Sequence, residues 1–308
     1  MVRVLRSSAT GALDSLTSVI LPSDCRVCGL PLAGFTLLPV CESCWNELPA
    51  QAGPLCVRCG EALSFEPLEG DSTLCRPCRA VPPDFDKALA HGVYDDKLRK
   101  LLHLLKYDGI EGLAKRLGAL VADVLLAVEG LPNDVVVVPV PLFAKKRKSR
   151  GFNQAEVLAR STAQALRRRR PEIRIKLAAA LLRRQRATES QAGLTPHQRR
   201  ENVRGALFVP RPEAVRGRHV LLIDDIYTTG ATARACSKEL RRAGAATVWV
   251  ATVARAQKVW TRTQMHAPAQ AEQELPMEQD FVFWEEKGAA RLSGAGMVLG
   301  SDERSGKN

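Results

Sequence analysis

The hydrophobic pattern along the chain predicts an α/β protein. Two apolar runs, at 135–140 and 220–223, stop at prolines or polar residues and are typical of buried parallel strands. Residues 87–94 alternate weakly, which favours an edge strand. We therefore expect a parallel sheet flanked by helices. Apolar residues at helical spacing predict those helices at 97–107, 114–128, about 153–170 and 231–242.

Polar residues with ligand-binding potential follow the run at 220–223. Asp224 and Asp225, here called the acidic pair, come next, and the threonine bend at 228–232 leads into the helix at 231–242. Open α/β sheets bind ligands at this junction of strand and helix. Amide groups at a helix start and threonine hydroxyls can hold an anion, and paired carboxylates can accept hydrogen bonds from sugar hydroxyls. A phosphorylated sugar fits both halves; the alternative is a solvated acidic pair after an ordinary strand.

This segment resembles the signature of the phosphoribosyltransferases: four apolar residues, two acidic residues, a short spacer, then Thr-Gly and Thr. The resemblance implies a type I phosphoribosyltransferase-like sheet. It also implies that the acidic pair holds the ribose hydroxyls of 5-phosphoribosyl 1-pyrophosphate (PRPP), while the threonine bend wraps the 5-phosphate. The matching and implied residues are Val220, Leu221, Leu222, Ile223, Asp224, Asp225, Thr228, Thr229, Gly230, Ala231 and Thr232.

A second strand–loop–helix unit places cations after the run at 135–140. In phosphoribosyltransferases the corresponding loop holds pyrophosphate, a leaving group of high negative charge. The resemblance therefore implies that this cationic segment, 139–153, steadies pyrophosphate; a solvated basic loop is the alternative. The candidate residues are Pro139, Val140, Pro141, Lys145, Lys148, Arg150 and Asn153.

The polar, cationic stretch 183–204 lies between the two predicted core strands in the sequence. A mobile flap that closes over the site would exclude water from a reactive sugar cation. Arg183, Arg186 and Gln191 are the candidate catalytic residues of such a flap. The alternative is an ordinary surface connection.

Eight of the nine cysteines form four Cys-x-x-Cys pairs. Two such pairs separated by a short loop can complete a tetrahedral zinc site, and the cytoplasmic location that we expect disfavours disulfides. A weak repeat, in which Cys25-Arg-Val-Cys-Gly resembles Cys56-Val-Arg-Cys-Gly, favours two tandem zinc ribbons, although crossed pairing remains open. The expected sets are Cys25, Cys28, Cys41 and Cys44 for one ion, and Cys56, Cys59, Cys75 and Cys78 for the other.

Composition limits the class of protein. No apolar run approaches about 18 residues, so we expect no transmembrane helix, and the start of the chain lacks the features of a signal peptide. The net charge of +12 is concentrated at 81–255, which carries 33 Lys and Arg against 17 Asp and Glu. A polyanionic small substrate or nucleic acid would explain this excess; a solvated basic face is the alternative. The cysteine-rich module is net acidic, which favours a structural or docking role.

The combined motifs resemble the ComF family, phosphoribosyltransferase-like proteins associated with bacterial competence. These motifs are the cysteine-rich N-terminus, Leu-Lys-Tyr-x-Gly at 105–109, Val-Pro-Val-Pro, Arg-Gly-Phe-Asn-Gln and the Arg-x-x-Arg-x-Thr-x-x-Gln-x-x-Leu pattern at 183–194. We expect four parts: an N-terminal helix (1–22), a double zinc ribbon (23–82), a phosphoribosyltransferase-like domain (83–255) and a flexible extension (256–308).

The resemblance implies a PRPP-binding phosphoribosyltransferase whose Mg²⁺ rides on the pyrophosphate, with an acceptor that the sequence does not reveal. Two non-catalytic alternatives remain. The chain could bind incoming single-stranded DNA through its basic middle, although aromatic residues for base stacking are scarce there. It could also be a zinc-anchored adaptor that docks to competence proteins.

Overall fold

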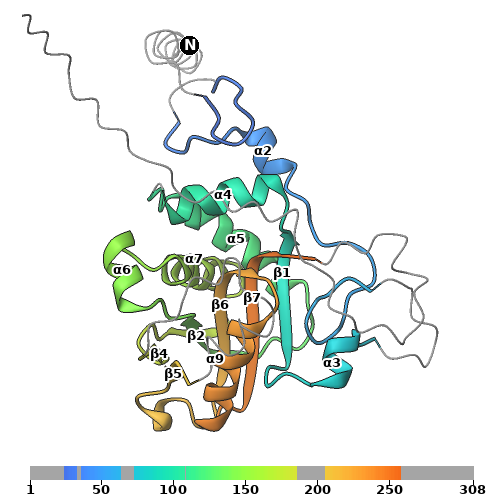
Figure 1. Cartoon of the computed structure of the whole chain (residues 1–308), viewed down its shortest axis with the longest axis vertical. Coiled ribbons are helices and arrows are strands. Elements are labelled where there is room, and N and C mark those ends of the chain that lie inside the picture. The colour runs from blue at the N-terminus through green and yellow to red at the C-terminus, as the bar shows by residue number, and fades with distance from the viewer. Residues whose placement is uncertain (1–23, 33–35, 64–72, 108, 186–204, 258–308) are drawn as a thin grey trace, which may run out of the picture. The chain divides into compact units, whose positions relative to one another are not determined.

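A five-stranded, all-parallel sheet forms the centre of the computed structural model (Figure 1). The structure describes residues 24–32, 36–63, 73–107, 109–185 and 205–257. The strands follow the spatial order β1-β7-β6-β2-β3, so the predicted fold class is confirmed. Their bounds are β1 (Lys87–Val93), β2 (Asp134–Pro139), β3 (Arg174–Leu177), β6 (His219–Tyr227) and β7 (Thr247–Arg255).

The two strands with the clearest apolar runs lie side by side in the middle of the sheet. Strand β2 pairs with β6 in parallel, from Val135 opposite His219 to Pro139 opposite Ile223. Their carboxyl ends therefore meet at one edge of the sheet, which brings the acidic pair and the cationic segment together. The predicted strand at 87–94 is confirmed as β1, an edge strand that pairs with β7.

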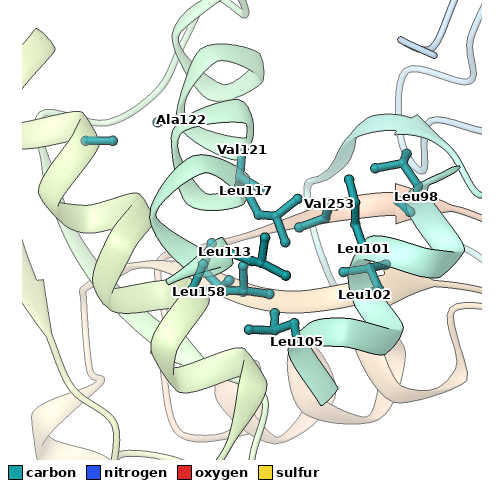
Figure 2. Close-up of a cluster of buried hydrophobic side chains, with 14 of the residues drawn as sticks. Leu98, Leu101, Leu102, Leu105, Leu113, Leu117, Val121, Ala122, Leu158 and Val253 are labelled. Atoms are coloured by element: carbon teal, nitrogen blue, oxygen red, sulfur yellow. The ribbon is translucent and has the colours of Figure 1, made fainter. Parts of the chain in front are cut away.

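Helices cover both faces of the sheet (Figure 1). Helices α4, α5 and α7 share a buried cluster with side chains from one face, and α9 joins the cluster on the other face. Figure 2 shows leucines of α4 and α5 meeting Leu158 of α7 and Val253 of β7. Their bounds, close to the predicted ones, are α4 (Asp96–Lys106), α5 (Leu113–Leu126), α7 (Gln154–Arg169) and α9 (Ala231–Arg242).

The two cysteine-rich ribbons pack against different faces. Val27, Val40 and Trp45 of the first ribbon join the cluster of α4, α5 and α7, whereas the cysteines of the second ribbon join the cluster of α9 with Phe85. Each ribbon thereby extends a hydrophobic core that the sheet already provides. The remaining elements are α2 (Glu42–Asn46), α3 (Arg76–Ala80), α6 (Ala144–Arg150), β4 (Arg183–Arg184), β5 (Leu207–Phe208) and the 3₁₀ helix η1 (Pro212–Ala214).

The segment between the ribbons runs along the outer edge of β1. Ala50 forms an antiparallel bridge with Gly92, and the amide of Val93 donates to the carbonyl oxygen of Pro49 at 3.3 Å. A Cβ atom at Gly92 would lie 2.1 Å from that carbonyl oxygen. Glycine is therefore required for the linker, here 49–51, to approach the strand.

Several expectations concern residues outside the described part of the chain. The predicted N-terminal helix, the flap candidates Arg186 and Gln191, and all but the first two residues of the expected extension belong to this group. The four-part domain division stays a prediction. Among the residues that the structure describes, no helix has the length and apolar character needed to cross a membrane.

Candidate functional site

The acidic pair lies at the carboxyl end of β6. The strand does not stop at Ile223, as the apolar run suggests, but continues through both aspartates to Tyr227. Within this extension each carboxylate accepts the backbone N–H of the following residue: Asp224 Oδ1 from Asp225 at 2.9 Å, and Asp225 Oδ1 from Ile226 at 2.8 Å. These bonds hold the two carboxylates beside the bend that follows.

Lys106, the lysine of the Leu-Lys-Tyr-x-Gly motif, was not among the predicted site residues, yet it reaches this pair from the last turn of α4. Its Nζ atom lies 2.5 Å from Oδ2 of Asp225, and both side chains are largely buried. Burial alone would lower the pKa of Lys106, but the Asp225 carboxylate outweighs it and the pKa is raised. Lys106 therefore carries a positive charge that partly neutralises the acidic pair.

The same surroundings act differently on Asp224. Burial, followed by the negative charge of Asp225, raises the pKa of Asp224 well above its ordinary value. Two adjacent carboxyl groups in a site with one cation resist full ionisation. A ligand that brings hydroxyl donors or a cation would therefore stabilise the charged form of Asp224.

The threonine bend turns the chain from β6 into α9. Gly230 precedes the helix with φ +75°, a left-handed conformation that favours glycine, and Oγ1 of Thr229 accepts the backbone N–H of Ala231 at 3.4 Å. The first amides of a helix have no partners within it and favour an anion. This backbone geometry favours an anion at the bend, and the assignment of Thr228–Thr232 to a phosphate stays a prediction.

The cationic segment begins beside the acidic pair. The amide of Val140 donates to the carbonyl oxygen of Ile223 at 2.9 Å. The prediction of a loop is wrong for part of the segment, because helix α6 contains Lys145, Lys148 and Arg150. Asn153 then closes it: its side chain accepts from the amide of Ala155 at 3.1 Å, capping α7, and donates to the carbonyl oxygen of Val140 at 3.1 Å.

The carboxyl end of α4 touches both halves of the candidate site. Lys106 pairs with Asp225, and its neighbour Tyr107 contacts Arg150 of the cationic segment. Nη2 of Arg150 donates to the Tyr107 hydroxyl at 3.2 Å, and the guanidinium carbon lies 4.8 Å from the ring centroid. Two consecutive residues therefore connect the acidic pair with the cations expected to bind pyrophosphate.

The structure describes only the first three residues of the predicted flap, 183–185. Arg183 lies in β4, which pairs with β5 in a two-stranded antiparallel sheet, and the side chain of Arg183 is exposed. Nothing places Arg183 in the site, and Arg186 and Gln191 lie outside the described residues. The flap stays a prediction.

Two four-cysteine clusters confirm the tandem pairing over the crossed one. In each set the four sulfur atoms lie within 4.8 Å of one another. Zinc–sulfur bonds of about 2.3 Å in a tetrahedron place the sulfurs about 3.8 Å apart. The observed separations are 3.8 Å for Cys25–Cys44, 3.7 Å for Cys28–Cys41 and 3.6 Å for Cys59–Cys75, so the sets fit two structural zinc ions.

The two clusters repeat the same backbone hydrogen bonds. Gly29 donates to the carbonyl oxygen of Cys25 at 2.7 Å, and Gly60 to that of Cys56 at 2.8 Å. Both glycines have positive φ, and in each ribbon the amide of the third cysteine donates to the sulfur of the first at 3.3 Å. The weak repeat in the sequence therefore corresponds to a structural duplication.

Comparison with known proteins agrees with this arrangement. A family model for the double zinc ribbon domain matches residues 16–79, and one for the phosphoribosyl transferase domain matches residues 153–268. The chain is 32% identical over 232 residues to the DNA utilization protein YhgH of Salmonella typhi, a match that covers 74% of this chain and 95% of that protein.

Two competence proteins are also similar. Competence protein F of Haemophilus influenzae is 29% identical over 70% of this chain and 90% of its own length. Competence protein ComFC of Bacillus subtilis is 27% identical over 67% of this chain and 80% of its own length. A solved glutamine PRPP amidotransferase of B. subtilis is similar at 24% identity and a TM-score of 0.29, covering 46% of this chain and 26% of that one. On the match to YhgH, this chain belongs to the ComF/YhgH family, with an N-terminal double zinc ribbon joined to a phosphoribosyltransferase domain.

Proposed function

We propose that this protein binds PRPP together with Mg²⁺ and transfers its phosphoribosyl group to an acceptor during the handling of DNA. One observation carries the proposal: the acidic pair and the threonine bend join β6 to α9, directly beside the cationic segment that follows β2. Carboxylates for the sugar, an anion site for the 5-phosphate and cations for pyrophosphate are thereby gathered at one edge of the sheet.

Each part of the site has a distinct task in this reaction. Asp224 and Asp225 accept hydrogen bonds from the ribose hydroxyls, and the bend from Thr228 to Thr232 holds the 5-phosphate. Lys148 and Arg150 steady the departing pyrophosphate, and Mg²⁺ bound to that group neutralises part of its charge. Positive charge that develops on the ribose is stabilised by the nearby carboxylates. Catalysis is then mainly positioning and electrostatic stabilisation.

In this scheme Lys106 is the cation that forms an ion pair with Asp225 before the substrate binds. This ion pair is buried, so breaking it would be unfavourable in free energy unless Asp225 gained another partner. Ribose hydroxyls that donate hydrogen bonds to Asp225 provide part of this new partnership. Lys106 thereby favours ligands that bring several donors to the carboxylates.

Calorimetry with PRPP and Mg²⁺ tests the proposal. The wild type should bind, and Asp224→Asn should weaken binding at least about tenfold because an amide replaces a carboxyl group that can accept hydrogen bonds from both ribose hydroxyls. Asp123→Asn is a matched control, since this exposed aspartate on α5 pairs with Arg169 instead of contributing to the site. Absence of binding by the wild type would refute the proposal. Pyrophosphate release with candidate acceptors would then test turnover.

A second candidate function, binding of single-stranded DNA, has its own structural observation. A cavity of about 390 Å³ beside α5 and α7 is lined by Lys115, Arg116, Arg168 and Arg169. The curated name of the YhgH relatives refers to DNA utilization. Titration of single-stranded DNA at two salt concentrations tests this function, because contacts to phosphates weaken as salt rises. The double variant Lys115→Gln/Arg168→Gln should lower the affinity for single-stranded DNA. An unchanged affinity would exclude this cavity as the DNA-binding site.

A further inference from the structure

Arg255, the last residue of β7, contacts the second zinc ribbon. Its side chain is buried, with 3% of its surface exposed. Nη1 donates to the carbonyl oxygen of Cys59 at 2.6 Å, and Nη2 lies 3.6 Å from the sulfur of the same cysteine. Nη2 also pairs with the carboxylate of Glu61. A guanidinium group therefore holds a predicted zinc ligand through its backbone and its sulfur together.

The other side of the same guanidinium faces Tyr227, the last residue of β6. The two residues are opposite each other in the paired strands, and the guanidinium carbon lies 4.2 Å from the ring centroid. The ring is buried and meets Phe85 edge to face at a centroid distance of 6.3 Å. A cation close to an aromatic face in a desolvated position binds it strongly. The position of Tyr227 is thus tied to Arg255.

Tyr227 in turn supports the threonine bend. A Cβ atom built on Gly230 would lie 2.2 Å from the Tyr227 hydroxyl oxygen, so the ring fills the space directly against the bend. A second contact joins the ribbon to the helix that follows: Nη1 of Arg234, in the first turn of α9, donates to the carbonyl oxygen of Val81 at 2.8 Å, just after α3. The second ribbon is therefore connected to the bend through Arg255 and Tyr227, and it directly contacts the helix that follows the bend.

We propose that the second zinc ribbon is a positioning element of the anion site, and that Arg255 and Tyr227 transmit the geometry of Cys59 to the threonine bend. A zinc ion held by the second cysteine set would fix the position of Cys59; Cys59 and Glu61 fix Arg255, and Arg255 fixes the ring that lies against Gly230. Identification of the bound anion as the 5-phosphate of PRPP rests on the proposed function. The first ribbon packs against the opposite face of the sheet and serves as an internal control.

Hydrogen exchange of the backbone amides at 228–232, measured by mass spectrometry together with zinc content, tests the coupling without any ligand. Cys59→Ser should lose one zinc ion and speed exchange in the bend about tenfold. Arg255→Met should keep both ions and still speed this exchange. Cys28→Ser, in the first ribbon, should lose one ion and leave the bend unchanged. Equal exchange in Arg255→Met and the wild type would overturn the proposal, as would an equal response to Cys28→Ser.

Binding measurements separate this inference from the proposed function. Arg255→Met should weaken ribose 5-phosphate and PRPP by the same factor, about tenfold, because both carry the 5-phosphate. If the wild type binds neither compound, the proposed function fails, while the exchange data still decide the coupling. Should Arg255→Met not fold, Glu61→Gln is the milder variant, since it removes the charged partner of Arg255 and leaves the zinc ligands intact. Wild-type exchange in Glu61→Gln would then count against the proposal.

Discussion

The ammonium group of Lys106 lies 2.5 Å from Oδ2 of Asp225, in surroundings that leave 18% and 8% of the two side chains exposed. Removing one partner of a buried pair leaves the other charged and desolvated. We expect Lys106→Met to lower the free energy of unfolding by about 3 kcal/mol, and Lys106→Met with Asp225→Asn to recover most of it. Urea unfolding measures both.

A control for this pair is Arg99→Met, which breaks an exposed ion pair with Asp96 on the same helix. Its cost should stay below about 1 kcal/mol. If the double variant were no more stable than Lys106→Met alone, the pair would not be coupled in the way that the geometry indicates.

Asp224 should make the protein less stable at neutral pH. Its pKa is raised by burial and by Asp225, so the folded state favours the protonated form. The resulting loss in the free energy of unfolding is absent below about pH 3.9, the pKa of an aspartate in the unfolded chain. It grows as the pH rises towards the pKa of Asp224 in the folded state. We expect Asp224→Asn to raise the Tm at neutral pH, by roughly 2–4 °C for each kcal/mol relieved. Calorimetric melting between about pH 4 and pH 8 should show the gain shrinking on acidification. A lower Tm at every pH would contradict this.

Gly230→Ala should be more damaging than a similar change elsewhere. Gly217 has φ +70° and nothing within 4 Å of an added Cβ, whereas Gly230 has φ +75° and Tyr227 in the way. Gly217→Ala therefore measures backbone strain alone, at about 1 kcal/mol. Gly230→Ala adds the collision and should cost at least about 2 kcal/mol in denaturant unfolding. Equal costs would show that the Tyr227 ring moves aside freely.

Substitution of Arg150 should affect binding of the pyrophosphate group and not binding of the rest of PRPP. Arg150→Ala should weaken PRPP about tenfold and leave ribose 5-phosphate unaffected, because only PRPP carries the pyrophosphate. Tyr107→Phe keeps the ring stacked on Arg150 and removes only the hydrogen bond, so its effect should be smaller. Arg147→Ala, on the same short helix and paired with Glu156, is the control. Equal weakening of both ligands by Arg150→Ala would place pyrophosphate elsewhere.

Local patterns in the sequence predict much of the fold. The helix at 231–242 has the expected bounds because an amphipathic run follows a Gly-containing bend. The expected elements do not include β7, although all but the first of its residues are buried and most are apolar. Nor do they include β3, in which Arg174 and Lys176 alternate with apolar residues in a strand of four residues. Helix α6 has no apolar periodicity at all, so the pattern of apolar residues gives no signal for it.

The site was predictable only where one segment contains it. The acidic pair and the threonine bend lie in one continuous segment, but Lys106 reaches Asp225, and Arg255 reaches Tyr227, from distant parts of the chain. No local propensity pairs Lys106 with Asp225; the packing of α4 against the sheet does. The Leu-Lys-Tyr-x-Gly motif was the available signal, since a lysine on the apolar face of a helix needs a partner.

The linker at 49–51 covers an edge of the sheet, and its position depends on the two cysteine-rich ribbons. It occupies the border of β1, where an unpaired strand can recruit a second molecule. Because a cysteine-rich ribbon that fits a zinc ion lies at each end of the linker, we expect chains without zinc to expose that border and to self-associate edge to edge. Zinc starvation would then be seen first as oligomers, before any loss of helical content.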